Sequence, residues 1–251
     1  MGYAMSDLHV LDLILFVSAT FAASFVAGLA GFAFGIIAAG VWLHFLSPAQ
    51  TATLIVAYGL IVQGVAVWKL RQAIKLERLW PFFIGGAIGV PIGSAILRWA
   101  SPTSLRLGVA VLLVVFSLYS LIRPKLGSIA GAGRMADGTV GVVNGVIGGA
   151  TGLAGIVATV WCTVRGWTPP EQRAVFQPVG VSVFLMTALW LGGTGMVGRD
   201  MVGLFLIGLP ALAAGTWLGL RFFGKLGETG FRRVVLLLLL VSGVALLIDN
   251  R

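Results

Sequence analysis

Ten apolar runs, separated by short polar stretches, make up most of this chain. Polar and apolar residues do not alternate inside the runs, whereas they do alternate in the lipid-facing strands of membrane barrels. The pattern therefore predicts an all-α, polytopic membrane protein whose helices are long enough to cross a bilayer or to dip into it. The predicted helical runs are 10–27, 28–46, 50–68, 80–98, 102–122, 137–150, 152–164, 174–192, 200–222 and 230–249.

The composition agrees with a chain that lies in lipid. Hydrophobic residues account for 59% of the 251 positions and charged residues for 10%, and the mean hydropathy is +1.04. Soluble domains carry about 25% charged residues, so this chain has too little polar surface for a water-exposed globule. We therefore expect residues 1–251 to form a single transmembrane domain. The net charge of +9 indicates cytoplasmic loops beside anionic lipid and no nucleic-acid partner.

The two halves of the chain resemble each other on either side of a polar linker, residues 123–137. The run GLAGFAFG at 28–35 matches GVIGGATG at 145–152, an offset of 117 residues, and each run is followed by a polar turn that contains proline. A second match, at an offset of 126 residues, pairs Gly89, Gly93 and Arg106 with Gly215, Gly219 and Arg232. Internal repeats of this kind are typical of secondary transporters, which predicts repeat one at 8–122 and repeat two at 138–251.

Basic residues predict the topology, because cytoplasmic loops are enriched in Lys and Arg. If each Gly-rich region returns the chain to the side where it started, most of the 17 basic residues share one side; a single long span would divide them almost evenly. We therefore expect both termini outside and two inverted repeats, each with a Gly-rich hairpin and three spanning helices. Residues 137–164 are too few for two full spans, so the second Gly-rich region is predicted to be re-entrant. The first could be re-entrant or two full crossings.

The Gly-rich hairpins are the predicted anion site. Glycine lets the backbone approach a ligand, and a helix that starts inside the membrane offers unpaired N–H groups to an anion. If the repeats are inverted, the tips of the two hairpins enter from opposite faces of the membrane and could meet near its midplane. The alternative is that these glycines are small-residue faces at which helices pack. The candidate substrate-binding residues are Gly31, Gly35, Gln50, Thr51, Asn144, Gly148, Gly149, Thr151, Gly152, Gln172 and Gln177.

Other kinds of chemistry find little support. All eight acidic residues fall at segment ends or in loops, which argues against a buried carboxylate relay or a metal cage. His44 and the single cysteine, Cys162, have no ligand cluster beside them in the sequence. No protease motif and no ATP-binding GxxxxGK[ST] motif occurs, so we expect no enzyme activity, no metal and no cofactor.

The Gly-rich stretches and the turns after them carry a family resemblance. The sequences concerned are AGLAGFAFGIIAAG and NGVIGGATGLAGIVATV, followed by SPAQTATLIVAYG and TPPEQRAVFQPVG. Over almost its whole length the chain resembles the TauE/SafE sulfite exporter family, although Phe32, Ala33 and Phe34 stand where the family has glycines. The resemblance implies a secondary transporter for sulfite, thiosulfate, sulfonates or related small anions.

We therefore expect an exporter that works by alternating access in the plasma (inner) membrane, with a small anion and the bilayer as its partners. The alternative is a membrane scaffold or assembly factor without transport activity. The sequence leaves open which anion is carried, the direction, the coupling ion and whether the chain forms a homo-oligomer.

Overall fold

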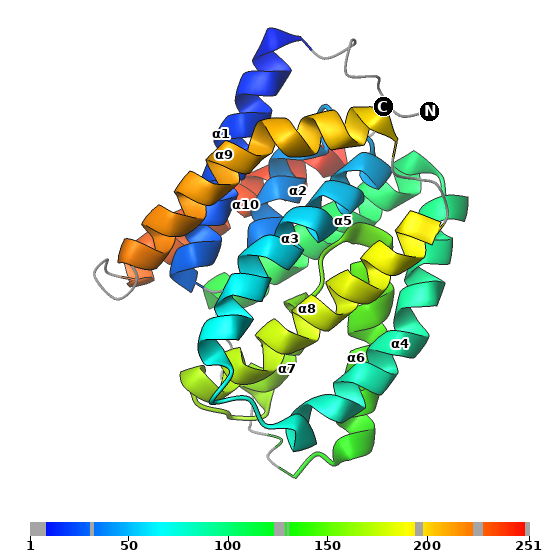
Figure 1. Cartoon of the computed structure of the whole chain (residues 1–251), viewed down its shortest axis with the longest axis vertical. Helices are drawn as coiled ribbons and strands as arrows, with labels where there is room; N and C mark the ends of the chain where they lie inside the picture. Colours follow the sequence, from blue (N-terminus) through cyan, green and yellow to red (C-terminus); the bar gives the residue numbers. More distant parts are fainter. Residues whose placement is uncertain are drawn as a thin grey trace. The chain divides into compact units, whose positions relative to one another are not determined.

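The computed structural model describes residues 9–30, 33–122, 129, 131–193, 198–222 and 228–248. These residues form helices and no strand, which confirms the predicted fold class. The helices, labelled in Figure 1, are α1 Val10–Ala30, α2 Phe34–Trp42, α3 Pro48–Leu70, α4 Leu76–Trp99, α5 Pro102–Ile122, α6 Arg134–Thr151, α7 Ile156–Val164, α8 Pro169–Gly193, α9 Arg199–Phe222 and α10 Glu228–Ile248.

Six of the helices in the described part are long and apolar enough to cross a membrane: α1, α3, α4, α5, α8 and α9. The chain is thus a multi-pass membrane protein. Helices α2 and α7 have nine residues each and rise about 13 Å, less than half of the roughly 30 Å hydrocarbon core. Each of them packs against the helix before it, α2 against α1 and α7 against α6.

The helix breaks lie later than the sequence pattern predicted. Helix α1 continues to Ala30, and the helix after it is only Phe34–Trp42, where the pattern predicted a run over 28–46. Helix α6 likewise continues to Thr151. In the first half the break therefore falls inside the Gly-rich run 28–35, whereas in the second half it falls at the end of the run 145–152.

The helices that follow the two Gly-rich runs begin at a different offset from the runs themselves. Helices α3 and α8 begin at Pro48 and Pro169, 121 residues apart, which is one helical turn more than the offset of 117. Helix α6 carries glycine at every fourth position, Gly141, Gly145 and Gly149. A shift of four residues still places glycine opposite Gly28 and Gly31, although Gly35 then pairs with Ile156.

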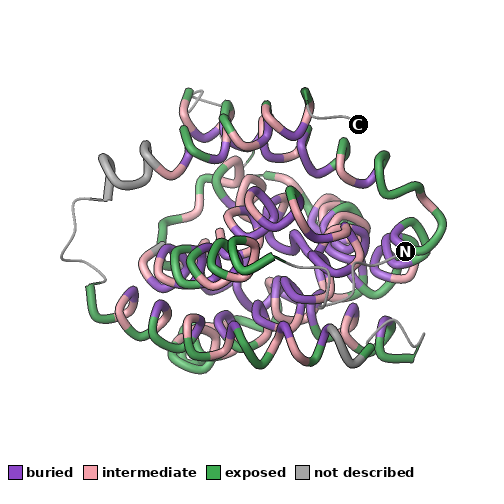
Figure 2. Tube along the Cα trace, turned by 90° about the horizontal axis from the view of Figure 1, so that it is seen from above, coloured by how far each residue is buried: buried purple, intermediate pink, exposed green. Residues whose placement is uncertain are grey.

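The chain folds into two compact units, and each unit contains helices from both halves of the sequence. Unit 1 is 1–55, 100–124 and 198–251, and unit 2 is 56–99 and 125–197. In unit 2, α4, α6 and α8 run alongside one another (Figure 1). Buried and exposed positions alternate along the helices (Figure 2).

Glycine stripes hold α4 against α6 in unit 2. A Cβ added at Gly89 or Gly93 would collide with a carbonyl oxygen of α6, and one added at Gly149 would lie 2.7 Å from the Val90 oxygen of α4. The residue before each of these two glycines of α4 is exposed and apolar: Ile88 and Ile92 are 55% and 49% exposed. One face of α4 thus approaches a neighbouring backbone, while an adjacent face offers isoleucines to lipid.

Unit 1 contains a corresponding contact between α1 and α9. A Cβ at Gly28 would lie 3.0 Å from the Cα of Gly219, and one at Gly219 would collide with the Phe25 oxygen. The Ser24 hydroxyl donates to the Ala211 oxygen at 3.4 Å. The packing interpretation of the glycines therefore holds for Gly28 and, in unit 2, for Gly149.

Candidate functional site

The break between α6 and α7 is an elbow built on two glycines. Gly152 ends α6 with φ 74° and ψ 1°, and its N–H donates to the Gly148 oxygen at 2.8 Å. Gly155, with φ 106°, precedes the first residue of α7. Both φ angles lie in the left-handed region, which residues with a Cβ enter only at a cost of about 1–2 kcal/mol. We refer to residues 152–155 as the α6–α7 elbow.

Asn144 ties the elbow back onto α6. Its Oδ1 accepts a hydrogen bond from the Gly155 N–H at 3.0 Å, and its side chain is 0% exposed. Its Nδ2 has no hydrogen-bond partner in the described part of the chain. A buried donor without a partner costs about 1–3 kcal/mol. The elbow therefore holds a buried amide donor next to the start of α7.

The first turn of α7 adds backbone donors at the same place. The N–H of Thr159 is the first to close the helical ladder, at 2.8 Å from the Gly155 oxygen. The N–H groups of the three preceding residues have no acceptor within the helix. No side chain caps this end, and no acidic residue lies in the first turn. The positive end of the helix dipole is thus left without a negative side chain on its own helix.

Other predicted residues build the elbow and its surroundings. Thr151 donates to the Ile147 oxygen at 2.7 Å and accepts from the Leu153 N–H at 3.2 Å, so its hydroxyl shapes the turn. Gly148 leaves room for α8: a Cβ there would lie 2.5 Å from a methyl group of Val183. The structure thus brings Asn144, Gly148, Thr151 and Gly152 together at one elbow.

The break in the first half is similar, but it contains no glycine at its left-handed position. Ala33 precedes α2 with φ 82°, and the Ile37 N–H donates to its oxygen at 3.0 Å. No side chain caps α2, and its first turn contains no acid. Gly35 lies in that first turn, half-buried, whereas Gly31 lies outside the described residues.

The predicted glutamines have different local roles. Gln50 forms a capping box at the start of α3, where its Oε1 accepts from the backbone N–H of Ser47 at 3.1 Å and from its hydroxyl at 2.9 Å. Gln172 donates to the Trp167 oxygen at 2.8 Å. Gln177 is buried within α8. Thr51, next to Gln50, is buried too, and its hydroxyl has no partner among the described residues.

A charged cluster at one end of unit 2 was not predicted from the sequence. Asp137 lies in the first turn of α6 and is only 6% exposed, although its position suggested a solvated segment end. Trp161 donates to Asp137 through its indole N–H at 2.7 Å, and an Arg165 nitrogen lies 3.8 Å from the other carboxylate oxygen. These partners are 24 and 28 residues away along the chain, so no local pattern could have identified them.

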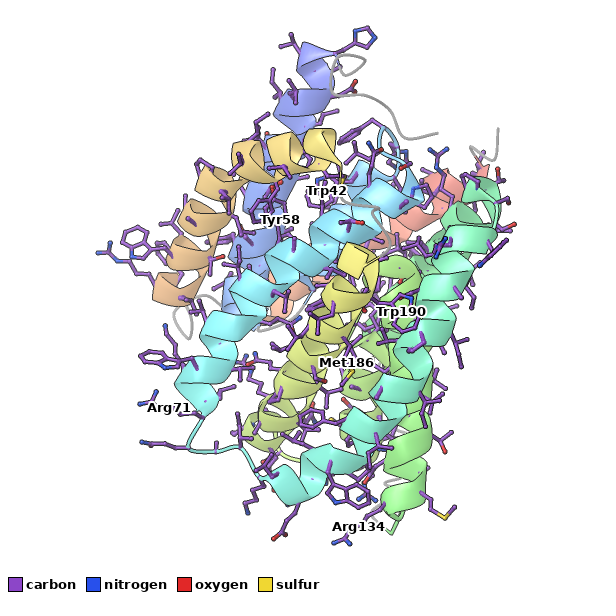
Figure 3. All side chains as sticks on the ribbon, turned by 45° about the vertical axis from the view of Figure 1, so that its right-hand side comes forward. Trp42, Tyr58, Arg71, Arg134, Met186 and Trp190 are labelled. Carbon is purple, nitrogen blue, oxygen red and sulfur yellow. The ribbon has the colours of Figure 1, made fainter. Side chains whose placement is uncertain are left out.

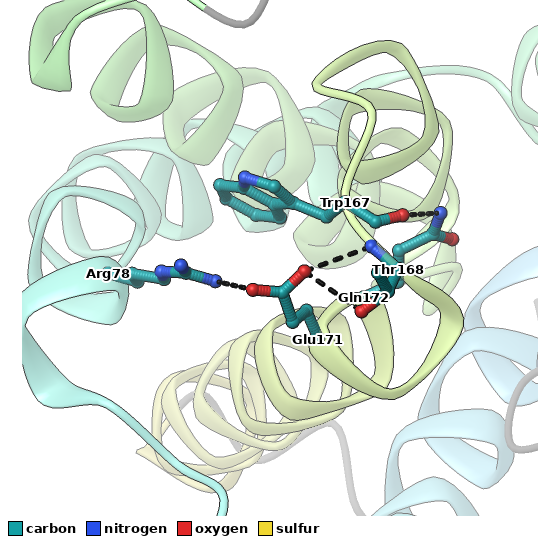
Figure 4. Close-up of polar contacts among 5 residues, drawn as sticks. All are labelled: Arg78, Trp167, Thr168, Glu171 and Gln172. Carbon is teal, nitrogen blue, oxygen red and sulfur yellow. Dashed lines mark hydrogen bonds and ion pairs between the residues drawn. The ribbon is translucent and has the colours of Figure 1, made fainter.

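The cluster continues across the start of α8 (Figure 4). The guanidinium carbons of Arg78 and Arg165 each lie 5.3 Å from the ring centre of Trp167. Arg78 also forms an ion pair with Glu171 at 3.0 Å. Arg134, over the ring of Trp80, and Arg71 lie at this same end of unit 2 in Figure 3. Arg71, Arg78, Arg134 and Arg165, which the predicted topology places on one side of the membrane, therefore lie at one end of this unit.

A comparison with known families identifies the chain's relatives. Residues 16–246 match the family model described as sulfite exporter TauE/SafE. The chain belongs to the TauE/SafE sulfite exporter family. No curated protein and no solved structure matches it. TauE/SafE proteins are membrane transporters of sulfite and related anions and not enzymes, so this chain belongs to an anion-transporter family.

Proposed function

We propose that this TauE/SafE protein is a secondary exporter of sulfite or a related small sulfur-containing or organic anion, and that it binds the anion at its helix elbows during alternating access. The observation that carries the proposal is the α6–α7 elbow. There the unpartnered Nδ2 of Asn144 lies beside the first backbone N–H groups of α7, and no acidic residue lies in that first turn.

These donors suit an oxyanion better than a cation. Amide and backbone N–H groups can only donate, and the helix dipole adds partial positive charge at the same end. In a buried site such donors attract an anion strongly, because no water competes for them. Within the described residues no group of three His, Cys, Asp or Glu could hold a metal ion.

The test is sulfite efflux from proteoliposomes that contain wild type or Asn144→Asp. Aspartate has nearly the same shape and keeps an oxygen for the Gly155 N–H, but it replaces the Nδ2 donor with a negatively charged oxygen. We expect this carboxylate to take the place of the anion and to lower efflux at least tenfold, the factor that corresponds to about 1.4 kcal/mol.

The matched control is Ser104→Asp. It adds the same charge at the exposed start of α5, where Ser104 contacts Ser101. We expect wild-type efflux from this control. Efflux at the wild-type level in both variants would remove the elbow as the binding site. Absence of flux of sulfite, thiosulfate and sulfonates in the wild type would contradict the transport function itself.

A further inference from the structure

A small charged cavity lies beside the turn between α3 and α4, at the end of unit 2 where the basic residues gather. Its volume is about 50 Å³. A single water needs about 10–15 Å³ by this measure, so an anion of a few heavy atoms has room here. The cavity is lined by Ala73, Lys75, Arg78, Glu171, Ala174 and Val175.

Arg78 is held in this wall, but only part of its hydrogen-bonding capacity is used. One guanidinium nitrogen contacts Glu171 Oε1 at 3.0 Å, and the guanidinium lies over the ring of Trp167 (Figure 4). The Arg78 side chain forms no other hydrogen bond in the described part of the chain. A guanidinium carries five N–H donors in a planar fork that matches two oxygens of an oxyanion. The indole therefore orients a group that can still bind an anion.

The two carboxylate oxygens of Glu171 contact different partners. Its Oε2 accepts from the Thr168 N–H at 3.0 Å and from the Thr168 hydroxyl at 2.9 Å, which caps α8, and its Oε1 occupies Arg78. The side chains of Arg78 and Glu171 are 35% and 41% exposed. Exposed ion pairs of this kind contribute little stability, so a dissolved anion can displace the carboxylate. Lys75, which is exposed and forms no ion pair among the described residues, adds a second positive charge.

We infer that this cavity is an entrance site at which Arg78 and Lys75 receive the transported oxyanion before it reaches the elbow, with the Glu171 carboxylate as an internal competitor. The inference rests on the proposed transport function. In the predicted topology Lys75 and Arg78 are cytoplasmic, which is the side from which an exporter takes its substrate.

The first test compares Arg78→Gln with Arg71→Gln in sulfite efflux from vesicles of neutral phosphatidylcholine. Both changes remove one positive charge near the same turn, but Arg71 lies over Trp68 and does not line the cavity. We expect Arg78→Gln to raise the KM for sulfite about tenfold with little change in maximal rate, because a charge-assisted hydrogen bond is lost. Arg71→Gln should keep the wild-type KM. Equal KM values in the two variants would overturn the inference.

The second test is Glu171→Gln, for which the first half of the chain supplies a precedent. Gln50 caps α3 from the same position in its turn, so glutamine at 171 keeps the capping box and removes only the charge. We expect the KM for sulfite to fall about two- to fivefold, since the competitor for Arg78 is gone. An unchanged or raised KM would contradict the competitor role and with it the entrance site.

The same assay, repeated in vesicles that contain anionic lipid, separates a soluble anion from a lipid headgroup. If Arg78→Gln changes the KM only when anionic lipid is present, the cavity binds a headgroup and the inference is wrong. If the wild type transports sulfite and Arg78→Gln has the wild-type KM, the entrance site is contradicted but the proposed transport function is not. Absence of wild-type flux of all the anions tested removes both this inference and the proposed function.

Discussion

Single residues determine where the helices break, and the two breaks use different residues for the same backbone geometry. Gly152 and Gly155 adopt left-handed angles in the second half, whereas Ala33 adopts one in the first. The Gly-rich pattern predicted broken helices in both halves. It could not predict Ala33, because an alanine in this region is disfavoured locally and is held there by the surrounding packing.

This difference predicts opposite effects of two exchanges on the free energy of unfolding. A Cβ at Gly155 meets no atom within 4 Å, so Gly155→Ala tests the backbone angle alone. We expect it to lower the unfolding free energy by about 1–2 kcal/mol and Ala33→Gly to raise it by about 1 kcal/mol. Denaturant unfolding in detergent measures both. A Gly155→Ala variant as stable as wild type would show that the elbow is not left-handed.

Among the candidate site residues, the sequence identified those at the second elbow but not what they contact. Asn144 was a polar residue in an apolar run, which is unusual enough to attract notice. Its bond to Gly155 depends on how the chain turns after Thr151. The ion pair of Arg78 with Glu171 could not be predicted from the sequence, because 93 residues separate the partners.

At the scale of helices, glycine spacing determines which faces pack. Both α4 and α6 carry glycine at every fourth position, which brings their backbones into close contact. The sequence pattern showed the stripes in both helices. It could not show that these two stripes meet, because several helices of this chain carry similar ones.

Replacement of a packed glycine is expected to separate α4 from α6. Gly89→Ala places a methyl group against the Val142 oxygen and should lower the unfolding free energy by about 1–3 kcal/mol. The control is Gly64→Ala in α3, where a Cβ meets nothing within 4 Å; it should be neutral or stabilise by up to about 1 kcal/mol. Thermal unfolding in detergent compares the two. Equal effects would show that the stripe is not a contact surface.

At the scale of the whole chain, the number and order of helices followed from hydropathy, and the grouping of helices did not. Ten apolar runs predicted ten helices, and ten occur in the described residues. Both compact units nevertheless combine helices from the two sequence halves, as α4 with α6 and α1 with α9. Hydropathy indicates which segments enter lipid. It does not indicate which helices pack together, because an apolar face is about as stable against lipid as against another helix.

The inverted topology remains a prediction, and it has a direct test at this scale. Reporter fusions that are active on one side of the membrane only should place the linker at 123–137 in the cytoplasm and the C-terminus at Arg251 outside. The charge distribution gives the reason, since the basic loops gather on the linker's side. A cytoplasmic C-terminus would contradict the paired hairpins and, with them, alternating access between inverted repeats.

The central claim is that the α6–α7 elbow binds an oxyanion through Asn144 and the first turn of α7. Titration of sulfite into purified wild type and Asn144→Asp, followed by isothermal calorimetry, tests it most directly. We predict saturable heat at one class of site for wild type and a loss of that heat for Asn144→Asp, with unfolding temperatures of the two ligand-free proteins that remain comparable. Equal sulfite binding by both proteins would contradict the account.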